Sequence, residues 1–363
     1  MRIVVKIGSS SLVDAAGRVN HAGIATLVAD IASAHEAGHR IVVVSSGAIA
    51  TGLGLLGHTE RPSELPALQA ASAVGQGALF AVWAREFQSS DVHAAQVLLT
   101  MHDASHRASW VNARNTIEQL LGWNVIPIVN ENDTTATDEI TFGDNDTLAA
   151  QVAVAVEADA LLLLTDTDGL YTEHPSHPDA QLIERVDDHS LLRRIDTATP
   201  GSHWGSGGMR SKVIAAEMAS AGGTTTFIAR SSTQDVVSSI ASGGHIGTRV
   251  APDRRQGTSF KLWLRYAKQT RGAVHVDDGA WTAIVERGAS LLPVGIQSID
   301  GEFIAGDAVS VHCASRGGEF ARGIVGYGSG ELRMGLTDRA RLRGVGEAIH
   351  RDQLVVFGSS TEA

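Results

Sequence analysis

Apolar, β-branched segments alternate with longer segments of helical period along the first two thirds of the chain. The expected strands cover residues 3–7, 41–44, 94–98, 125–129, 161–165 and 225–228, and the expected helices cover 24–37, 65–87, 109–121, 145–156 and 213–221. Strands that are apolar throughout need cover on both faces, and helices between successive strands supply it. The pattern therefore predicts an α/β fold with a parallel or mixed sheet.

The last hundred residues have a different pattern of expected secondary structure. Short expected strands at 274–276, 308–311 and 354–357 are separated by glycine-rich turns, and helical periods are missing, which is typical of a small β-barrel. A chain of 363 residues can bury two cores. We predict a first domain at 1–255, a boundary at 256–270 in which 260–264 form either a linker or a last strand, and a second domain at 271–363.

Composition limits the classes of partner. The net charge is −11, all of it in residues 1–255, because 256–363 carry 12 basic and 12 acidic side chains. Broad nucleic-acid binding is therefore not expected. A single cysteine, Cys313, excludes an intramolecular disulfide and fits a reducing compartment. The chain begins directly in a strand, and no apolar run approaches the ~20 residues of a membrane helix. These features predict a cytoplasmic protein without a membrane partner.

Two lysines stand beside glycine-rich backbone. Lys6 ends an apolar strand that breaks on Gly8 into a run of serines, and Lys212 closes the loop Gly205-Ser-Gly-Gly-Met-Arg-Ser-Lys212 before a helix. Glycine frees backbone N–H groups, and a cation next to them favours phosphate oxygens. Lys6 could instead be a structural lysine that extends its ammonium to the surface. Lys212 could be a surface lysine, although a cation at a helix N-terminus is disfavoured unless an anion shares the site.

Polar clusters follow several of the expected strands, where ligands of such folds bind. Asn130-Glu-Asn-Asp133 follows the strand 125–129, Gly143-Asp-Asn-Asp146 precedes a helix, and Thr165-Asp-Thr-Asp-Gly169 ends another strand. A helix N-cap accounts for one residue of the second cluster, and an Asx turn could account for the third. Ser46 and Gly47 offer a hydroxyl and open N–H groups. Gathered carboxylates require cations, such as a substrate ammonium, Mg²⁺ or the two lysines.

Two other segments match known motifs, but we do not expect either to form the corresponding site. His35-Glu-Ala-Gly-His39 matches a zinc-protease pattern, but Gly38 is expected to end a helix, which separates the two histidines. Gly52-Leu-Gly-Leu-Leu-Gly57 matches a dinucleotide fingerprint but begins well after its strand, so we expect a mobile loop over the site at 51–66. No Walker A pattern occurs.

Taken together, the motifs resemble those of the amino acid kinase family, and within it the glutamate 5-kinases, over essentially the whole chain. The matching strings are Val4-Val-Lys-Ile-Gly-Ser9, Val44-Ser-Ser-Gly-Ala-Ile49, Asn130-Glu-Asn-Asp133, Phe142-Gly-Asp-Asn-Asp146, Leu164-Thr-Asp-Thr-Asp-Gly-Leu-Tyr171 and Gly205 to Lys212. The last ~90 residues resemble a PUA domain. The resemblance implies a three-layer sandwich with a mostly parallel central sheet, followed by a small β-barrel-like domain. It also implies transfer of the ATP γ-phosphoryl group to the γ-carboxylate of L-glutamate, the first step of proline biosynthesis.

The resemblance assigns roles to individual residues. Lys6 and Lys212 would bind the transferring phosphoryl group, and Asp146 would orient both lysines. The substrate glutamate would be held by Ser46, Gly47, Asp133 and Asn145, with its α-ammonium on Asp133. The nucleotide would contact Lys6, Gly8, Thr165, Asp166, Ser206, Gly207, Gly208, Met209, Arg210, Ser211 and Lys212. Arg210 and Ser211 replace a pair of small hydroxyl residues expected before the lysine, and no protein ligand is assigned to Mg²⁺.

The resemblance further implies a homo-oligomer, either a dimer or a tetramer, feedback inhibition by proline, and transfer of the product to glutamyl-phosphate reductase. Two alternatives stay open. One is another amino acid kinase, acting on acetylglutamate, aspartate, a uridine nucleotide or carbamate. The other is an RNA-binding protein that acts through its PUA domain, which the neutral charge of residues 256–363 disfavours.

Overall fold

The computed structural model describes residues 1–14, 16–100, 103, 107–135, 144–192, 208–253, 259–266, 268, 270–337 and 346–357. The chain divides into two compact units, Met1–Ser259 and Phe260–Ala363. This division falls inside the boundary predicted at 256–270. Each unit is described by itself.

The first unit is built on an eight-stranded sheet in the order β3-β4-β2-β1-β5-β7-β8-β6. All neighbouring strands pair in parallel except β7 and β8. Its strands are β1 (Arg2–Ile7), β2 (Arg40–Ser45), β3 (His93–Leu99), β4 (Val125–Glu131), β5 (Ala160–Thr165), β6 (Arg185–Val186), β7 (Thr225–Arg230) and β8 (Thr248–Val250). Its helices are α1 (Ser9–Leu12), α2 (His21–Glu36), α3 (Ala48–Leu55), α4 (Leu65–Ser89), α6 (Arg107–Gly122), α7 (Asp144–Ala155), α9 (Gly208–Ala221) and α10 (Val236–Ala241). The mostly parallel sheet is confirmed.

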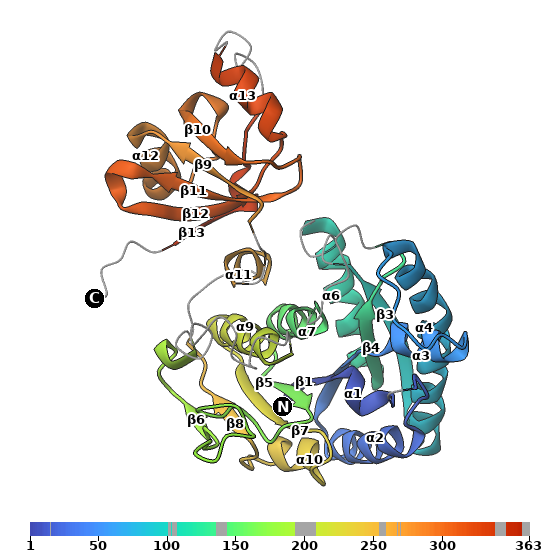
Figure 1. Cartoon of the computed structure of the whole chain (residues 1–363). Coiled ribbons are helices and arrows are strands. Elements are labelled where there is room, and N and C mark those ends of the chain that lie inside the picture. The colour runs from blue at the N-terminus through green and yellow to red at the C-terminus, as the bar shows by residue number, and fades with distance from the viewer. Residues whose placement is uncertain are drawn as a thin grey trace. The chain divides into compact units, whose positions relative to one another are not determined.

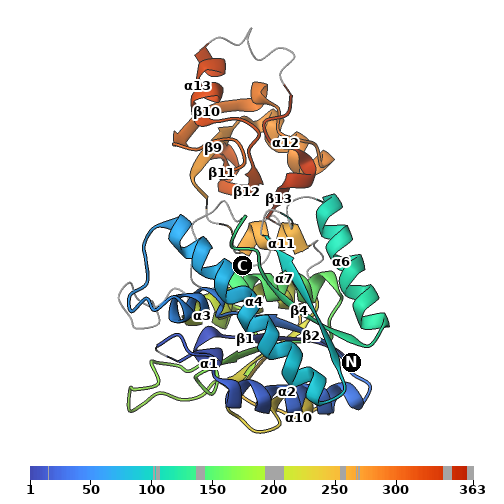
Figure 2. The ribbon, with the colours of Figure 1, turned by 90° about the vertical axis from the view of Figure 1, so that its right-hand side faces the viewer.

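Alternation along β1 sends its side chains to opposite layers. Ile3, Val5 and Ile7 belong to a buried cluster shared with α2, α4 and α10, so the intervening Val4 and Lys6 face the opposite side. Figure 1 shows α7 and α9 over that opposite face and α2 and α10 over the first, and Figure 2 shows α7 again on the side away from α2 and α10. The sequence of β1 thus places one lysine in the layer between the sheet and the pair α7–α9.

Close contact between α3 and α4 explains the glycine at position 52. A Cβ on Gly52 would lie 1.8 Å from the carbonyl oxygen of Ala71, and one on Gly75 would lie 1.9 Å from that of Ala48. Gly54 contacts the backbone of Gly17 in the same way. The prediction of a mobile loop at 51–66 is therefore wrong for its first part, because these glycines let two helix backbones touch. The described segment between the helices spans residues 56–64.

Helix α4 has 25 residues and is apolar enough to cross a membrane, judged by length and composition alone. The sequence analysis did not expect this, because polar residues interrupt every apolar run of the helix. Trp83 and Phe87 are fully buried and stack on each other inside the core shared with α2 and β4. The inner face of α4 is therefore part of the core of this unit.

The predicted break in the zinc-protease pattern is confirmed. Helix α2 ends at Glu36, and Gly38 follows with φ of 89° before β2 begins at Arg40. A left-handed glycine at this position is the usual end of a helix. His35 and His39 therefore do not share a helical face.

The second unit contains a five-stranded sheet in the order β10-β9-β11-β12-β13. Its strands are β9 (Gly272–Val276), β10 (Ile296–Gly301), β11 (Ala308–Cys313), β12 (Gly318–Ile324) and β13 (Leu354–Val356). Its helices are α11 (Ser259–Tyr266, which begins one residue before the division), α12 (Asp278–Arg287) and α13 (Ser329–Thr337), with short turns of 3-10 helix at Pro293–Gly295, Ala314–Arg316 and Arg351–Gln353.

Two expectations about this unit are wrong. Residues 260–264 form part of α11 instead of a strand, and the rings of Phe260 and Trp263, three residues apart on this helix, lie with their centroids 5.6 Å apart. Helices are also present beyond residue 271. The start of α12 is capped by Asp277, which accepts a hydrogen bond from the N–H of Ala280, and Ile284 is buried.

Candidate active site

Strand order sorts the candidate residues into two groups. Neighbouring strands run β4-β2-β1-β5-β7. Ser46 follows β2 and Asp133 follows β4, whereas Thr165 ends β5 on the other side of β1. The carboxyl ends of parallel strands lie at one edge of the sheet. Ser46 and Asp133, assigned to glutamate, therefore lie on one side of Lys6, and Thr165, assigned to the nucleotide, lies on the other.

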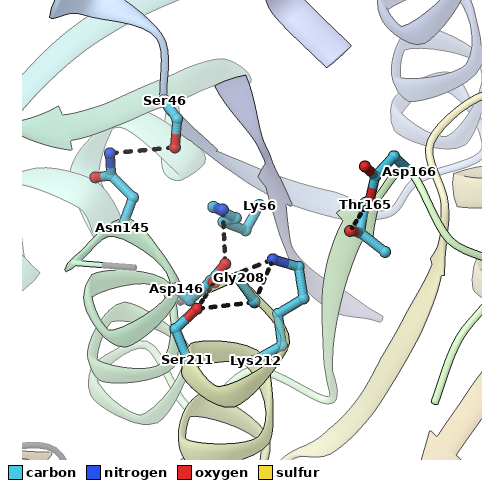
Figure 3. Close-up of polar contacts among 9 residues, drawn as sticks. All are labelled: Lys6, Ser46, Asn145, Asp146, Thr165, Asp166, Gly208, Ser211 and Lys212. Atoms are coloured by element: carbon cyan, nitrogen blue, oxygen red, sulfur yellow. Dashed lines mark hydrogen bonds and ion pairs between the residues drawn. The ribbon is translucent and has the colours of Figure 1, made fainter. Parts of the chain in front are cut away.

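At the centre, two lysines from different elements converge on one carboxylate (Figure 3). The Nζ of Lys6 lies 2.6 Å from Oδ1 of Asp146, and the Nζ of Lys212 lies 3.2 Å from Oδ2. Asp146 is 1% exposed, Lys6 5% and Lys212 6%. The predicted convergence of the three residues is present in the structure. We call them the lysine–aspartate centre.

The centre carries one more positive than negative charge in a buried place. Burial alone would raise the pKa of Asp146, but the charges of Lys6 and Lys212 outweigh it and hold that pKa below its usual value. Burial lowers the pKa of Lys6, and the neighbouring Lys212 adds to this, while Asp146 opposes both. A bound anion would relieve the excess positive charge. Asp146 is consequently unsuited to act as a base. It is suited to orient two cations, one at each of its carboxylate oxygens.

The start of α9 supplies a further contact to Asp146. The hydroxyl oxygen of Ser211 lies 2.6 Å from Oδ2 of Asp146 and 3.0 Å from the carbonyl oxygen of Gly208, and its single proton is shared between these two acceptors. That same carbonyl accepts from Lys212 at 3.0 Å. The sequence assigned Ser211 to the nucleotide, whereas here its hydroxyl holds the carboxylate. Met209 and Arg210 occupy the same first turn of α9, and Ser206 and Gly207 lie outside the described residues.

Asn145 and Ser46, which the resemblance assigns to glutamate, are in hydrogen-bonding contact. The amide nitrogen of Asn145 donates to the hydroxyl oxygen of Ser46 at 3.2 Å. The amide oxygen of Asn145 is buried and has no hydrogen-bond partner among the described residues. An unpartnered buried acceptor suits a substrate N–H donor. Gly47 precedes α3 with φ of 94°, a conformation that favours glycine at this turn.

Asp133 is buried against α4, a contact that the sequence analysis missed. The hydroxyl of Ser72 donates to Oδ2 of Asp133 at 2.5 Å. One turn later, Gln76 accepts a hydrogen bond from the amide of Asn130 at 2.6 Å. Burial raises the pKa of Asp133, opposed by the Ser72 hydrogen bond and the charge of Arg61. A signal was present in the sequence, because Ser72 and Gln76 are polar residues four apart on an alanine-rich helix.

On the nucleotide side, Thr165 donates to Oδ1 of Asp166 at 3.1 Å (Figure 3). The sequence analysis missed the neighbours of this segment on β7. Arg230 binds both oxygens of Asp168, at 2.5 and 3.2 Å, and Tyr171 donates to Asp168 at 3.0 Å. The Arg230 hydrogen bond lowers the pKa of Asp168, with the Tyr171 hydrogen bond contributing and burial opposing.

The turn after β1 belongs to the same edge. A Cβ on Gly8 would lie 3.9 Å from the Nζ of Lys6, so the glycine backbone adjoins the ammonium. The hydroxyl of Ser11 lies 2.7 Å from that of Ser231, which follows β7. The backbone N–H of Ser231 donates to the carbonyl oxygen of Thr165 at 2.8 Å. The backbone N–H of Ser11 donates to the carbonyl oxygen of Gly8 at 3.1 Å. Ser11 and Ser231 therefore connect Gly8 to Thr165, both of which are assigned to the nucleotide.

A model of the amino acid kinase family matches residues 1–230 of the chain. The chain belongs to the amino acid kinase family. A model of the PUA domain matches residues 272–341. Among curated relatives, the glutamate 5-kinase of Nostoc punctiforme is 43% identical and that of Ralstonia nicotianae 42%, each covering 98% of this chain and 99% and 97% of the relative. Membership of the family and the C-terminal PUA domain, both predicted from the sequence, are confirmed.

Solved structures agree on the fold. The carbamate kinase of Giardia matches 69% of this chain and 99% of its own with a TM-score of 0.50 at 18% identity. A crystal structure from Aeropyrum pernix K1 matches with a TM-score of 0.52 at 16% identity and covers 69% of this chain and 99% of its own. Likeness at this level of identity supports the amino acid kinase fold of the first unit.

Family membership directs attention to the metal that accompanies ATP. In the described part of the chain, no three histidine, cysteine or acidic side chains are grouped so as to hold a metal ion. Asp146 is engaged by two lysines, and Asp166 accepts from Thr165. Both carboxylates are therefore already engaged by other side chains of the chain.

Proposed function

We propose that the chain transfers the γ-phosphoryl group of ATP to the γ-carboxylate of L-glutamate and forms L-glutamyl 5-phosphate. The observation that carries the proposal is the position of the lysine–aspartate centre between two sets of polar residues. On one side are Asp133, Asn145 and Ser46, and on the other are Thr165 and Asp166. A donor and an acceptor bound on opposite sides would meet at the two lysines.

The chemistry requires neutralisation and alignment more than proton transfer. The γ-carboxylate of glutamate has an unperturbed pKa of about 4.3 and is ionised at neutral pH, so it needs no general base. The two anions repel each other, and Lys6 and Lys212 would offset that repulsion and the charge on the transferring group. Mg²⁺ on the nucleotide would neutralise phosphate charge further.

On the acceptor side, we assign the α-ammonium of glutamate to Asp133 and a further N–H contact to Asn145. The relatives named glutamate 5-kinase match nearly the full chain, which supports this substrate over other carboxylates. On the donor side, we assign ATP to Lys6, Gly8, Thr165, Asp166 and the loop ending at Lys212. The proposal includes the wider expectations from the sequence: a cytoplasmic homo-oligomer inhibited by proline, which delivers its acyl phosphate to glutamyl-phosphate reductase.

The test is hydroxylamine trapping of the acyl phosphate. Purified protein would be incubated with ATP, Mg²⁺, hydroxylamine and either glutamate, acetylglutamate or aspartate. We expect hydroxamate from glutamate alone. Hydroxamate from another acid would keep the phosphotransfer chemistry and change the substrate. A folded protein that forms hydroxamate from none of the three would overturn the proposal.

A further inference from the structure

Helix α4 forms a wall beside the residues that follow β4. Its inward residues Leu68, Leu79 and Val82 are apolar and buried. Ser72 is an exception, since it is 3% exposed and its hydroxyl binds Oδ2 of Asp133 at 2.5 Å. We use the name acceptor wall for Ser72 and Gln76 together with their partners Asp133 and Asn130.

Backbone contacts fix the position of Ser72. Its neighbour Ala71 lies with its carbonyl oxygen 1.8 Å from where a Cβ on Gly52 would be, and Gly75 makes the reciprocal contact with Ala48. Helices α3 and α4 therefore touch on both sides of Ser72, with no room for either backbone to approach further. The hydroxyl is consequently held at a set depth against Asp133.

The bond to Ser72 leaves one carboxylate oxygen of Asp133 for a ligand. An ionised carboxylate only accepts hydrogen bonds, so Ser72 is the donor and Oδ2 is its acceptor. No hydrogen bond to Oδ1 is found within the described ranges. An ammonium group is the complementary partner for this remaining oxygen.

We propose that Ser72 is a positioning residue that makes the enzyme prefer acceptors with an α-ammonium group, by holding Oδ2 of Asp133 and leaving Oδ1 for that ammonium. The inference rests on the proposed function, because it assumes that the acceptor lies against Asp133. Under this inference, Ser72 on α4 contributes to the choice of substrate through Asp133, which lies 61 residues away in the sequence.

The test compares glutamate with glutarate, which has the same two carboxylates and no amine. In Ser72→Ala, kcat/KM for glutamate is expected to fall about ten- to a hundredfold, mainly through KM, as for loss of a hydrogen bond to a charged group. For glutarate the change should stay within about threefold, since no ammonium contacts Asp133. Ser89→Ala is the matched control, because Ser89 is an exposed serine of the same helix that donates to the carbonyl oxygen of Glu86.

The dependence of kcat/KM on pH gives a second measurement. A purely structural role of Ser72 in packing would not change it. Ionised Asp133 is needed for the ammonium, and burial already raises its pKa, while Ser72 and the charge of Arg61 oppose this rise. Ser72→Ala removes one of the two contributions that lower the pKa of Asp133 and leaves the other, the charge of Arg61, in place. The acid limb of kcat/KM for glutamate should therefore move to higher pH, and the limb for glutarate should stay where it is.

A double-mutant cycle with Asp133→Asn separates positioning from packing. If Ser72 acts through the carboxylate, adding Ser72→Ala to Asp133→Asn should change kcat/KM for glutamate by less than about threefold. Equal losses for both acids, an unmoved acid limb, or additive effects in the cycle would overturn the inference while leaving the glutamate kinase intact. A wild-type protein that phosphorylates neither acid would overturn the proposed function as well.

Discussion

The lysine–aspartate centre and the acceptor wall hold their carboxylates in opposite ways. At the centre, two lysine charges overcome the burial of Asp146 and lower its pKa. At the wall, burial prevails over Ser72 and Arg61, and the pKa of Asp133 is raised. Under the proposed function, the centre would bind an anion through surplus positive charge, and the wall would bind a cation through a carboxylate whose burial makes ionisation costly. The difference implies that centre variants should change kcat and wall variants should change KM for the acceptor.

The strongest challenge to this comparison is Asp146→Asn. The substitution preserves shape but leaves two buried lysine charges next to each other without compensation. We expect kcat in the hydroxamate assay to fall about 10³-fold or more, since one residue positions both cations. Bound anions such as sulfate should raise the melting temperature of this variant more than that of the wild type.

Asp30→Asn is the matched control for loss of a buried carboxylate. Asp30 on α2 accepts hydrogen bonds from the backbone of Val237 and Ser238 at 2.7 and 3.0 Å, at the start of α10. This control should lower the melting temperature and leave kcat nearly unchanged. A kcat loss below tenfold in Asp146→Asn would show that the lysines do not depend on the carboxylate.

Lys212→Ala should have the next largest effect. Removing one of the two cations should cost about 10²–10³ in kcat, by analogy with loss of one oxyanion donor. KM for glutamate should change little, because the acceptor wall is untouched. Circular dichroism and the melting temperature would check that the fold is retained. A loss of less than tenfold would remove Lys212 from the chemistry.

Gly75→Ala tests whether the wall depends on helix contact. The new Cβ would lie 1.9 Å from the carbonyl oxygen of Ala48 and 2.4 Å from the backbone nitrogen of Gly52, and backbone atoms cannot yield locally. We expect unfolding to become easier by about 2–3 kcal/mol and KM for glutamate to rise, because α4 must shift away from Asp133.

Gly77→Ala, two residues along the same helix, is the control for that variant. A Cβ there would meet nothing within 4 Å, so alanine should be neutral or stabilise by up to about 1 kcal/mol. Thermal melting and steady-state kinetics of both variants would be measured together. If Gly75→Ala and Gly77→Ala had the same melting temperature and the same KM for glutamate, the contact of α3 with α4 would not determine the position of the acceptor wall.

The same comparison explains what the sequence could and could not predict. Lys6, Asp146 and Thr165 were predicted because each is a polar residue at a strand or helix end, where local pattern reveals it. Ser72 was missed because its partner lies 61 residues away, and the pairing depends on how closely two helices pack. Local pattern also failed for α11, where five residues are too few to separate a strand period from a helical one.

Arg230→Gln should give the smallest effect and extend the comparison to the nucleotide side. Arg230 binds Asp168, and its guanidinium is also affected by the charge of Asp166. Without Arg230, the negative charges of Asp166 and Asp168 would lie uncompensated near the phosphates of bound ATP. The ion pair is exposed, 41% and 48% for the two side chains, so we expect KM for ATP to rise only about two- to fivefold, with kcat and KM for glutamate unchanged.

Ionic strength and a second substitution distinguish this charge effect from a structural one. Salt should shrink the change in KM for ATP, because exposed charges are screened. Asp168→Asn placed in the Arg230→Gln background should restore most of the affinity by removing the uncompensated carboxylate. Arg85→Gln, at an exposed ion pair near the end of α4, should leave KM for ATP unaltered. If Asp168→Asn failed to restore affinity, Arg230 would contact the nucleotide directly, and the donor side would bind its anion as the centre does.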